Sequence, residues 1–216
     1  DLRFYVERQI DWAPLVELTE FFHKAEGSPA TADEAVEFYR GVLEMIGEFS
    51  AAEIAPHAAR IDREHPTLAN GDVVTPALLA GIFERMKGLE LHGMCVPREL
   101  GGMNCPFLVF LLGSELLARA DVSVAAHNGF HAGIAMALLL FSTSEGTTEF
   151  DRDRVCITKT RFAEAIGEIL RGEAWGSMDI TEPGAGSDMA ALRTRGEQDA
   201  DGNWFVTGEK IFITSG

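Results

Sequence analysis

Residues 178–188, with the sequence MDITEPGAGSD, carry the groups of this chain that are best suited to hold a polar ligand. The two glycines in this stretch let backbone N–H groups come close to a ligand, because no Cβ stands in the way. Successive N–H groups in such a turn form a concave site for anions, and the hydroxyls of Thr181 and Ser187 both donate and accept hydrogen bonds. We therefore expect the loop to hold a polar, partly anionic group against its main chain.

A second group of informative residues follows downstream, over residues 201–216. The Asp-Gly dipeptide that opens it is typical of a hairpin turn, which predicts one strand over residues 192–198 and another over residues 204–207. Weak alternation of apolar and polar side chains predicts a third strand over residues 211–214. The glycine-rich loop is therefore expected within a β-sheet, unlike Walker and Rossmann phosphate loops, whose glycines open a helix.

Three blocks in this region resemble the flavin-binding β-domain signature of the acyl-CoA dehydrogenase family. They are Ile180-Thr-Glu-Pro-Gly-Ala-Gly-Ser-Asp188, then Asp201-Gly-x-Trp204, then Gly208-x-Lys210-x-x-Ile213-Thr214-x-Gly216. One Gly-x-Gly would mean little, whereas three blocks in this order and spacing are specific. Residues 53–57 and 88–102 also resemble the family's N-terminal helices, so the resemblance covers most of residues 34–216.

The resemblance implies an α+β fold, in which an all-α helical bundle precedes the first strands of an antiparallel, β-barrel-like domain. It implies an α-helical domain over residues 33–172 and the start of an incomplete middle β-domain over residues 173–216. Residues 1–32 lie outside the common family pattern and are interpreted as an N-terminal extension that packs on the main body. The family's catalytic base is a Glu from a C-terminal helical domain, and no residue here matches it. We therefore expect the chain to be the N-terminal part of a longer polypeptide, inactive by itself and weak in binding FAD.

The function that the resemblance implies is α,β-dehydrogenation of an acyl-CoA thioester to the enoyl-CoA. In that reaction a carboxylate takes the α proton and N5 of FAD takes the β hydride. By the same resemblance, the residues that contact FAD are Met178, Ile180, Thr181, Gly186, Ser187, Phe212, Ile213 and Thr214. Ser187 is also expected to contact the CoA thioester arm of the substrate. An electron-transferring flavoprotein as acceptor and a homotetramer, or another homo-oligomer, are implied as well.

Several positions keep other interpretations open. Thr181 and Thr214 could simply satisfy strand ends, and Ser187 could be a turn cap. Phe212 stands where many family members carry a Trp that packs on the flavin, and Asp179 replaces a small or apolar residue. The flavin-contacting residues in this part of the chain are shared with acyl-CoA oxidases and flavin monooxygenases of the same fold, so these two functions remain alternatives. A non-catalytic helical binding module with a β appendix is the interpretation from another class.

Three charged side chains near the glycines resemble acid–base groups but are not assigned to catalysis. We expect Glu182 and Asp188 to shape the loop by accepting local backbone N–H bonds. Lys210 is expected to support the sheet or to form an ion pair.

The charge of the chain argues against some partners. Its 34 acidic and 18 basic residues give a net charge of −16, which disfavours nucleic acid and anionic membranes and requires local Lys or Arg side chains wherever anionic CoA binds. The three cysteines lack Cys-x-x-Cys spacing, which favours reduced thiols in the cytoplasm. The longest apolar run, near residues 134–141, is too short to span a bilayer.

Hydrophobic periodicity predicts helices over residues 33–61, 76–87, 106–120, 123–141 and 161–170, after an irregular start with a short helical stretch over residues 12–22. On the fourth of these helices, His127 and His131 stand four residues apart and could present two metal ligands on one face. No third ligand stands out, so we predict no metal there. We expect this helix surface to face the flavin, the substrate tunnel or another subunit.

Overall fold

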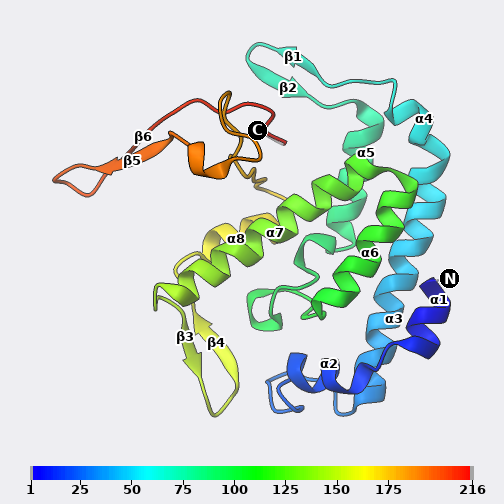
Figure 1. The fold of residues 1–216 in the computed structure, drawn as a ribbon. Helices are drawn as coiled ribbons and strands as arrows, with labels where there is room; N and C mark the ends of the chain where they lie inside the picture. Colours follow the sequence, from blue (N-terminus) through cyan, green and yellow to red (C-terminus); the bar gives the residue numbers. More distant parts are fainter. Residues whose placement is uncertain (1, 215–216) are drawn as a thin grey trace. The chain divides into compact units, whose positions relative to one another are not determined.

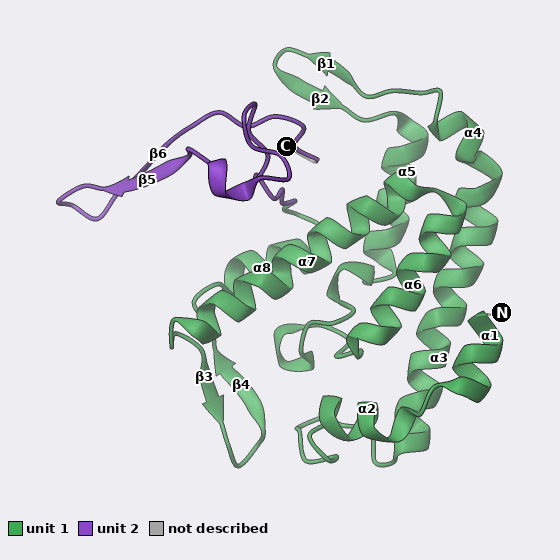
Figure 2. Cartoon of the chain, in the orientation of Figure 1, with its two compact units in different colours: residues 1–174 green, residues 175–216 purple. Residues whose placement is uncertain are grey.

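The computed structural model describes residues 2–214. The chain divides into two compact units, residues 1–174 and residues 175–216 (Figure 2). Unit 1 is built mainly of helices, and unit 2 contains one antiparallel hairpin with irregular segments on both sides. The expected order of a helical domain followed by antiparallel strands is confirmed, and no closed barrel forms among the described residues.

The long helix expected over residues 33–61 forms in four successive pieces. These are α3 (Ala32–Phe49), a π-helical turn (Ser50–Ile54), a 3₁₀ turn (Ala55–His57) and α4 (Ala58–Ile61). Pro56 lies where the geometry changes, because it has no N–H to donate and its ring crowds the preceding turn. Thr31 caps the start of α3, since its hydroxyl accepts from the N–H of Glu34 at 3.2 Å.

Four further helices form where the sequence predicts them. They are α5 (Ala77–Gly88), α6 (Phe107–Ala120), α7 (Val122–Ser144) and α8 (Ala163–Leu170). Pro76 occupies the N-cap position of α5 rather than its first helical position. Asp121 separates α6 from α7 and caps α7, because its carboxylate accepts from the N–H groups of Ser123 at 2.9 Å and Val124 at 3.1 Å. The pairs α3–α6, α6–α7 and α7–α8 pack against one another (Figure 1).

Helix α7 is long and apolar enough to cross a membrane by length and composition alone. The apolar run over residues 134–141 belongs to this 23-residue helix, which is longer than the run itself indicates. One face of α7, including Val124, Ala135 and Leu139, is buried within unit 1. Packing in a helical core therefore accounts for the apolar residues on this face, whereas Val122, Leu140 and Phe141 of the same helix are exposed.

Two hairpins form between the predicted helices, in segments where the sequence analysis predicts no strand. Strand β1 (Thr67–Ala69) pairs with β2 (Asp72–Val74), and β3 (Glu149–Asp151) pairs with β4 (Cys156–Lys159). Asn70 and Gly71 turn the first hairpin with φ of 54° and 92°. An Asn-Gly pair is the strongest short-range hairpin signal because both residues tolerate positive φ, so the sequence did carry this information.

The hairpin of unit 2 joins β5 (Arg195–Gln198) to β6 (Trp204–Thr207), with Gln198 opposite Trp204. Strand β6 has the predicted bounds, whereas β5 starts later because a 3₁₀ turn, Met189–Ala191, precedes it. The predicted third strand over residues 211–214 is wrong, since none of these residues is in a strand. Phe212 has a φ of 56° there, and this left-handed conformation is incompatible with an extended strand.

The N-terminal segment is part of the core of unit 1. It contains α1 (Leu2–Phe4), a π-helical turn (Tyr5–Gln9) and α2 (Trp12–Thr19). Its buried members are Trp12 and Val16 of α2, whereas Phe4 and Tyr5 are exposed. The N-terminal extension therefore packs on the rest of unit 1 through α2 rather than through its first residues.

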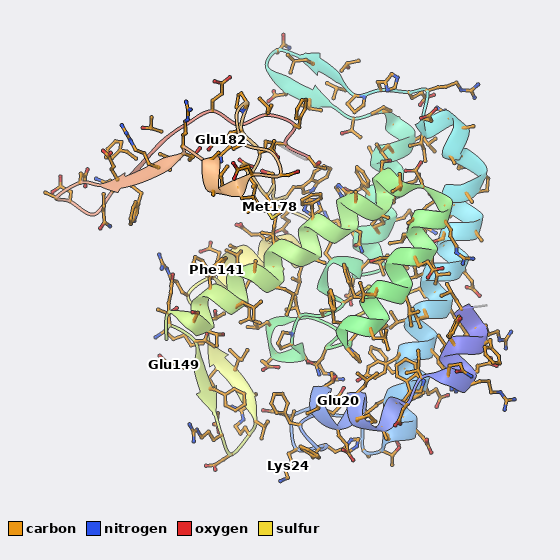
Figure 3. All side chains as sticks on the ribbon, viewed as in Figure 1. Glu20, Lys24, Phe141, Glu149, Met178 and Glu182 are labelled. Atoms are coloured by element: carbon orange, nitrogen blue, oxygen red, sulfur yellow. The ribbon has the colours of Figure 1, made fainter. Side chains whose placement is uncertain are left out.

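A buried ion pair fastens this segment to the rest of unit 1. Glu20, which has no exposed surface, accepts from the guanidinium of Arg98 at 2.6 and 2.8 Å and from the hydroxyl of Tyr39 at 2.9 Å (Figure 3). Burial opposes ionisation of Glu20, but the bonds from Arg98 and Tyr39 outweigh it and lower the pKa of this carboxyl. The carboxylate therefore stays charged inside the fold only because it has these partners.

Replacing Arg98 by Met leaves the buried carboxylate of Glu20 without its cation. We expect the free energy of unfolding of unit 1 to fall by about 3 kcal/mol or more, as when one partner of a buried ion pair is removed. The matched control is Arg85→Met, because Arg85 pairs with Glu53 on the surface and an exposed pair contributes less than about 1 kcal/mol. Urea unfolding measures both variants, and equal losses would contradict the assignment.

Candidate functional site

The glycine-rich loop of unit 2 closes on itself through its main chain. The N–H of Glu182 donates to the carbonyl of Ala185 at 3.1 Å, and the N–H of Ala185 donates to the carbonyl of Glu182 at 3.0 Å. Pro183 and Gly184 form the exposed tip of this turn, whereas Ala185 is buried. Proline fixes its own φ and glycine adds no side chain, so the sequence favours a tight, rigid turn.

The side chain of Glu182 joins this loop to the segment that leads into β5. It is 6% exposed, and its carboxylate accepts from the N–H of Arg193 at 2.8 Å, the N–H of Thr194 at 2.9 Å and the hydroxyl of Thr194 at 2.6 Å (Figure 3). The bond from the Thr194 hydroxyl, followed by the two backbone N–H bonds, lowers the pKa of Glu182 to about 2. Glu182 does shape the loop as expected, but through residues distant in the chain rather than local ones.

Lys210 brings a third segment to the same place. Its ammonium donates to the carbonyl of Ile180 at 2.9 Å and to the Glu182 carboxylate at 3.0 Å. The N–H of Ile211 then donates to the carbonyl of Thr181 at 3.0 Å. The residues before the glycine loop and those at the start of the terminal segment therefore lie side by side within unit 2.

Gly208 makes this arrangement sterically possible. A Cβ at position 208 would lie 2.2 Å from the hydroxyl oxygen of Thr194 and 2.9 Å from its Cβ. No side chain larger than hydrogen can therefore stand there while Thr194 keeps its bond to Glu182. This close approach gives a physical reason for the glycine in the third sequence block.

Several main-chain donors of the loop remain free. Within residues 2–214, the N–H groups of Thr181, Gly186 and Ser187 donate to no protein acceptor. A Cβ built on Gly184 or Gly186 would meet no atom within 4 Å, so open space adjoins the loop. Free N–H donors beside open space fit the carbonyl and nitrogen acceptors at the pyrimidine edge of a flavin ring. The residues present are therefore compatible with the cofactor that the resemblance implies.

The structure brings together some of the predicted cofactor residues and leaves others at the surface. Ile180 and Thr181 contact the terminal segment directly, and Phe212, Ile213 and Thr214 follow the contact residue Ile211 in the chain. The side chains of Met178 and Phe212 are 57% and 89% exposed. Their binding roles, like those of Gly186 and Ser187, stay predictions.

A second polar cluster lies inside unit 1. Nδ1 of His127 is 3.3 Å from Nε2 of His131, and the ring of His92 lies with its centroid 6.1 Å and 5.4 Å from theirs. Phe83 stacks on His127 at 3.6 Å. The sequence analysis missed His92, because it lies before the helix and no spacing relates it to α7.

This histidine cluster is neutral at neutral pH. Burial lowers the pKa of His127 to about 3 and that of His131 to about 4, and it also lowers the pKa of His92. In the part of the chain that the structure describes, no group of three or more His, Cys, Asp or Glu side chains is arranged to hold a metal ion. The cluster is therefore assigned to the buried core of unit 1, and what it faces beyond unit 1 stays a prediction.

Comparison with known proteins gives the chain its family. The family model described as "Acyl-CoA dehydrogenase, N-terminal domain" matches residues 37–150 of the 216. The chain belongs to the acyl-CoA dehydrogenase family. The matched residues run from α3 to β3 and thus lie within unit 1.

Individual members of the acyl-CoA dehydrogenase family align with both units. The 3-methylmercaptopropionyl-CoA dehydrogenase of Ruegeria pomeroyi is 29% identical over 100% of this chain and 32% of its own length. The broad-specificity linear acyl-CoA dehydrogenase of Mycobacterium tuberculosis is 31% identical over 89% of this chain and 29% of its own length. The chain thus spans about a third of the length of these relatives.

A solved structure supports the fold of this acyl-CoA dehydrogenase family chain. The acyl-CoA dehydrogenase of Bacillus anthracis, solved in complex with FAD, superposes with a TM-score of 0.60 at 20% identity. The superposition covers 82% of this chain and 26% of the other chain. At this identity the likeness establishes the shared fold.

The low pKa of Glu182 predicts how unit 2 responds to acid. Because the folded pKa of about 2 lies below the ordinary value of 4.5, the stabilisation is complete above about pH 4.5 and is lost as the pH falls toward 2. The NMR amide resonances of Arg193 and Thr194 should therefore titrate in this range. In a Glu182→Gln variant the chemical shifts of these amides should not change with pH over this range. A titration that persists in the variant would contradict the assignment.

The histidine cluster predicts a different window for unit 1. Below the ordinary histidine pKa of 6.5, unfolded chains take up protons that the buried rings of His127 and His131 resist until about pH 3 to 4. Stability is therefore complete above about pH 6.5 and falls below it, by about 1.4 kcal/mol per pH unit for each buried ring. A His127→Phe variant keeps the stack on Phe83. Its free energy of unfolding, measured with urea at several pH values, should depend less steeply on pH. His65→Gln, at an exposed position, is the control variant, and an equal change in both variants would contradict the assignment to the buried cluster.

Proposed function

We propose that the protein carrying this chain removes two hydrogens from an acyl-CoA thioester to give the enoyl-CoA, with FAD as its cofactor. The observation that carries this proposal is the pairing of residues 180–182 with residues 210–211, beside a loop with free N–H donors. The family membership of the chain and the names of its relatives support the same activity. Because the chain spans about a third of those relatives, activity and substrate belong to the whole protein.

Each residue of the candidate site has a proposed task. When bound, FAD would supply the acceptor for the β hydride of the acyl group. The N–H groups of Thr181 and Gly186 would donate to acceptors at the pyrimidine edge of its ring, where donors stabilise developing negative charge. The exposed ring of Phe212 would cover part of the flavin, and Met178, Ile180, Ile213 and Thr214 would complete its surroundings. Ser187 would contact both the cofactor and the thioester arm of the substrate.

Two further groups of side chains bear on the proposal. The α proton of the substrate must pass to a carboxylate base, and no carboxylate of the described residues is assigned that role. Glu182 is excluded from it, because a carboxyl with a pKa of about 2 is a poor base. The chain has 34 acidic and 18 basic residues, so binding of the anionic CoA requires cationic side chains nearby. The exposed Arg193 and Arg195 are candidates for this role.

The assembly and acceptor are proposed from the same family membership. The apolar side chains of Phe107 and Leu111 on α6 and of Leu140 and Phe141 on α7 are 50–65% exposed, and Figure 3 labels Phe141 among them. Exposed apolar side chains of this size are typical of surfaces that another domain or subunit covers. They support the proposal of a homo-oligomer. From the family membership we further propose that an electron-transferring flavoprotein reoxidises the cofactor and that the protein acts in the cytoplasm.

The whole protein, purified as it is expressed, provides the test of the proposed function. We expect a yellow protein whose flavin absorption bleaches when an acyl-CoA is added without oxygen, because the thioester reduces the cofactor. A series of acyl-CoA esters of different length and branching, monitored by this bleaching, identifies the substrate.

Two outcomes would redirect the proposal. Consumption of oxygen with each turnover would assign the protein to the acyl-CoA oxidases of the same fold. A colourless protein that does not respond to added FAD would contradict the flavoenzyme proposal and favour a non-catalytic binding module.

A further inference from the structure

The three segments of the candidate site meet at one carboxylate. The Glu182 network consists of Glu182, Arg193, Thr194 and Lys210. In it, Oε1 of Glu182 accepts from the N–H and hydroxyl of Thr194 and from Lys210, and Oε2 accepts from the N–H of Arg193. Each carboxylate oxygen offers about two acceptor positions, so the three donors on Oε1 saturate that oxygen, whereas Oε2 accepts a single bond. Most of the acceptor capacity of Glu182 is therefore used within unit 2, and its side chain is only 6% exposed.

The Glu182 network fixes the position of the residues that follow Lys210. Lys210 also bonds to the carbonyl of Ile180, and Ile211 bonds to the carbonyl of Thr181. Immediately afterwards the chain turns at Phe212, whose φ of 56° is uncommon for a residue with a bulky side chain. A strained residue of this kind persists only where its surroundings hold it in place, and the two bonds just before it provide that restraint.

The same network leaves the loop donors free for a ligand. The free N–H groups of Thr181, Gly186 and Ser187 are not needed to hold the loop, because the carboxylate and the turn from Glu182 to Ala185 already hold it. Donors that are fixed before a ligand arrives need no reordering when it binds, and this strengthens binding. The arrangement thus separates two tasks: the side chain of Glu182 holds the loop, and the main chain around it remains available.

We infer that Glu182 is a positioning residue, which sets the geometry of the flavin-binding edge through Thr194 and Lys210 and takes no part in proton transfer. This inference rests on the proposed function, since it gives the residue its task relative to a flavin. Glu182 acts by holding the main chain at Thr181 and the backbone at Phe212 in a fixed position relative to each other. Removal of its charge should therefore change the positions of both segments.

The test compares Glu182→Gln and Glu209→Gln in the whole, flavin-binding protein. Glu209 is an exposed carboxylate next to Lys210 and is the matched control. Loss of charge-assisted bonds in Glu182→Gln should weaken FAD binding by about tenfold or more, shift the flavin absorption spectrum and speed amide exchange at Ile211. Glu209→Gln should leave affinity, spectrum and exchange unchanged within about twofold.

A milder pair of variants keeps the inference testable where Glu182→Gln folds poorly. Thr194→Val removes the hydroxyl that donates to Glu182 at 2.6 Å with little change in size, and Thr194→Ser restores it. We expect weaker FAD binding and a shifted spectrum in Thr194→Val, and recovery of both in Thr194→Ser. A merely structural role would lower thermal stability in Thr194→Val without changing the spectrum of the bound flavin.

The outcomes separate this inference from the proposed function. Unchanged FAD affinity and spectrum in Glu182→Gln and Thr194→Val would overturn the positioning role while the flavoenzyme proposal stands. A wild-type protein that never binds flavin would overturn the proposed function and, with it, the task given to Glu182. Faster exchange at Ile211 in Glu182→Gln would then show only that the ion pair anchors the terminal segment.

Discussion

A buried carboxylate cannot remain charged inside a protein unless hydrogen bonds replace the water it loses, and unit 2 is organised around that requirement at Glu182. Two backbone N–H groups, one hydroxyl and one ammonium converge on this side chain. Each donor comes from a segment that would otherwise have little to hold it, because the strands of the only hairpin in the described part of unit 2 are exposed along their length. An isolated two-stranded hairpin is marginally stable in water, so the polar network supplies order that apolar burial does not.

Unit 1 meets the same requirement differently. Glu20 is fully buried, but it lies beside a large apolar core, and Arg98 neutralises it with two short bonds. Its network therefore attaches one segment to a fold that other contacts already define. In unit 2 the Glu182 network joins all three segments of the candidate site, so the same kind of interaction determines local architecture there.

The helices were predictable because they bury continuous apolar faces, and periodicity reports such faces directly. The hairpin of unit 2 was predictable from its turn residues, and the hairpin at Asn70 and Gly71 was equally accessible from the same rule. The terminal segment was not predictable, because alternation over four residues cannot register a bend at Phe212 that depends on distant anchors. The sequence blocks contain the segments that meet in the structure, residues 180–182 and 210–211, whereas the partners of Glu182 depend on tertiary geometry. His92 was missed for the same reason, since it meets His127 and His131 only through folding.

The glycines of the candidate site have different surroundings in the structure, although the sequence alone does not distinguish them. Gly208 is required because Thr194 occupies the space that a Cβ would need, and this contact serves the Glu182 network. Gly184 and Gly186 face open space, so packing within the chain gives no reason for them. Under the proposed function, the absence of a side chain at these two positions would let a ligand approach the main chain closely. Gly208 therefore maintains the fold of unit 2, whereas Gly184 and Gly186 would, under the proposed function, leave room for the cofactor.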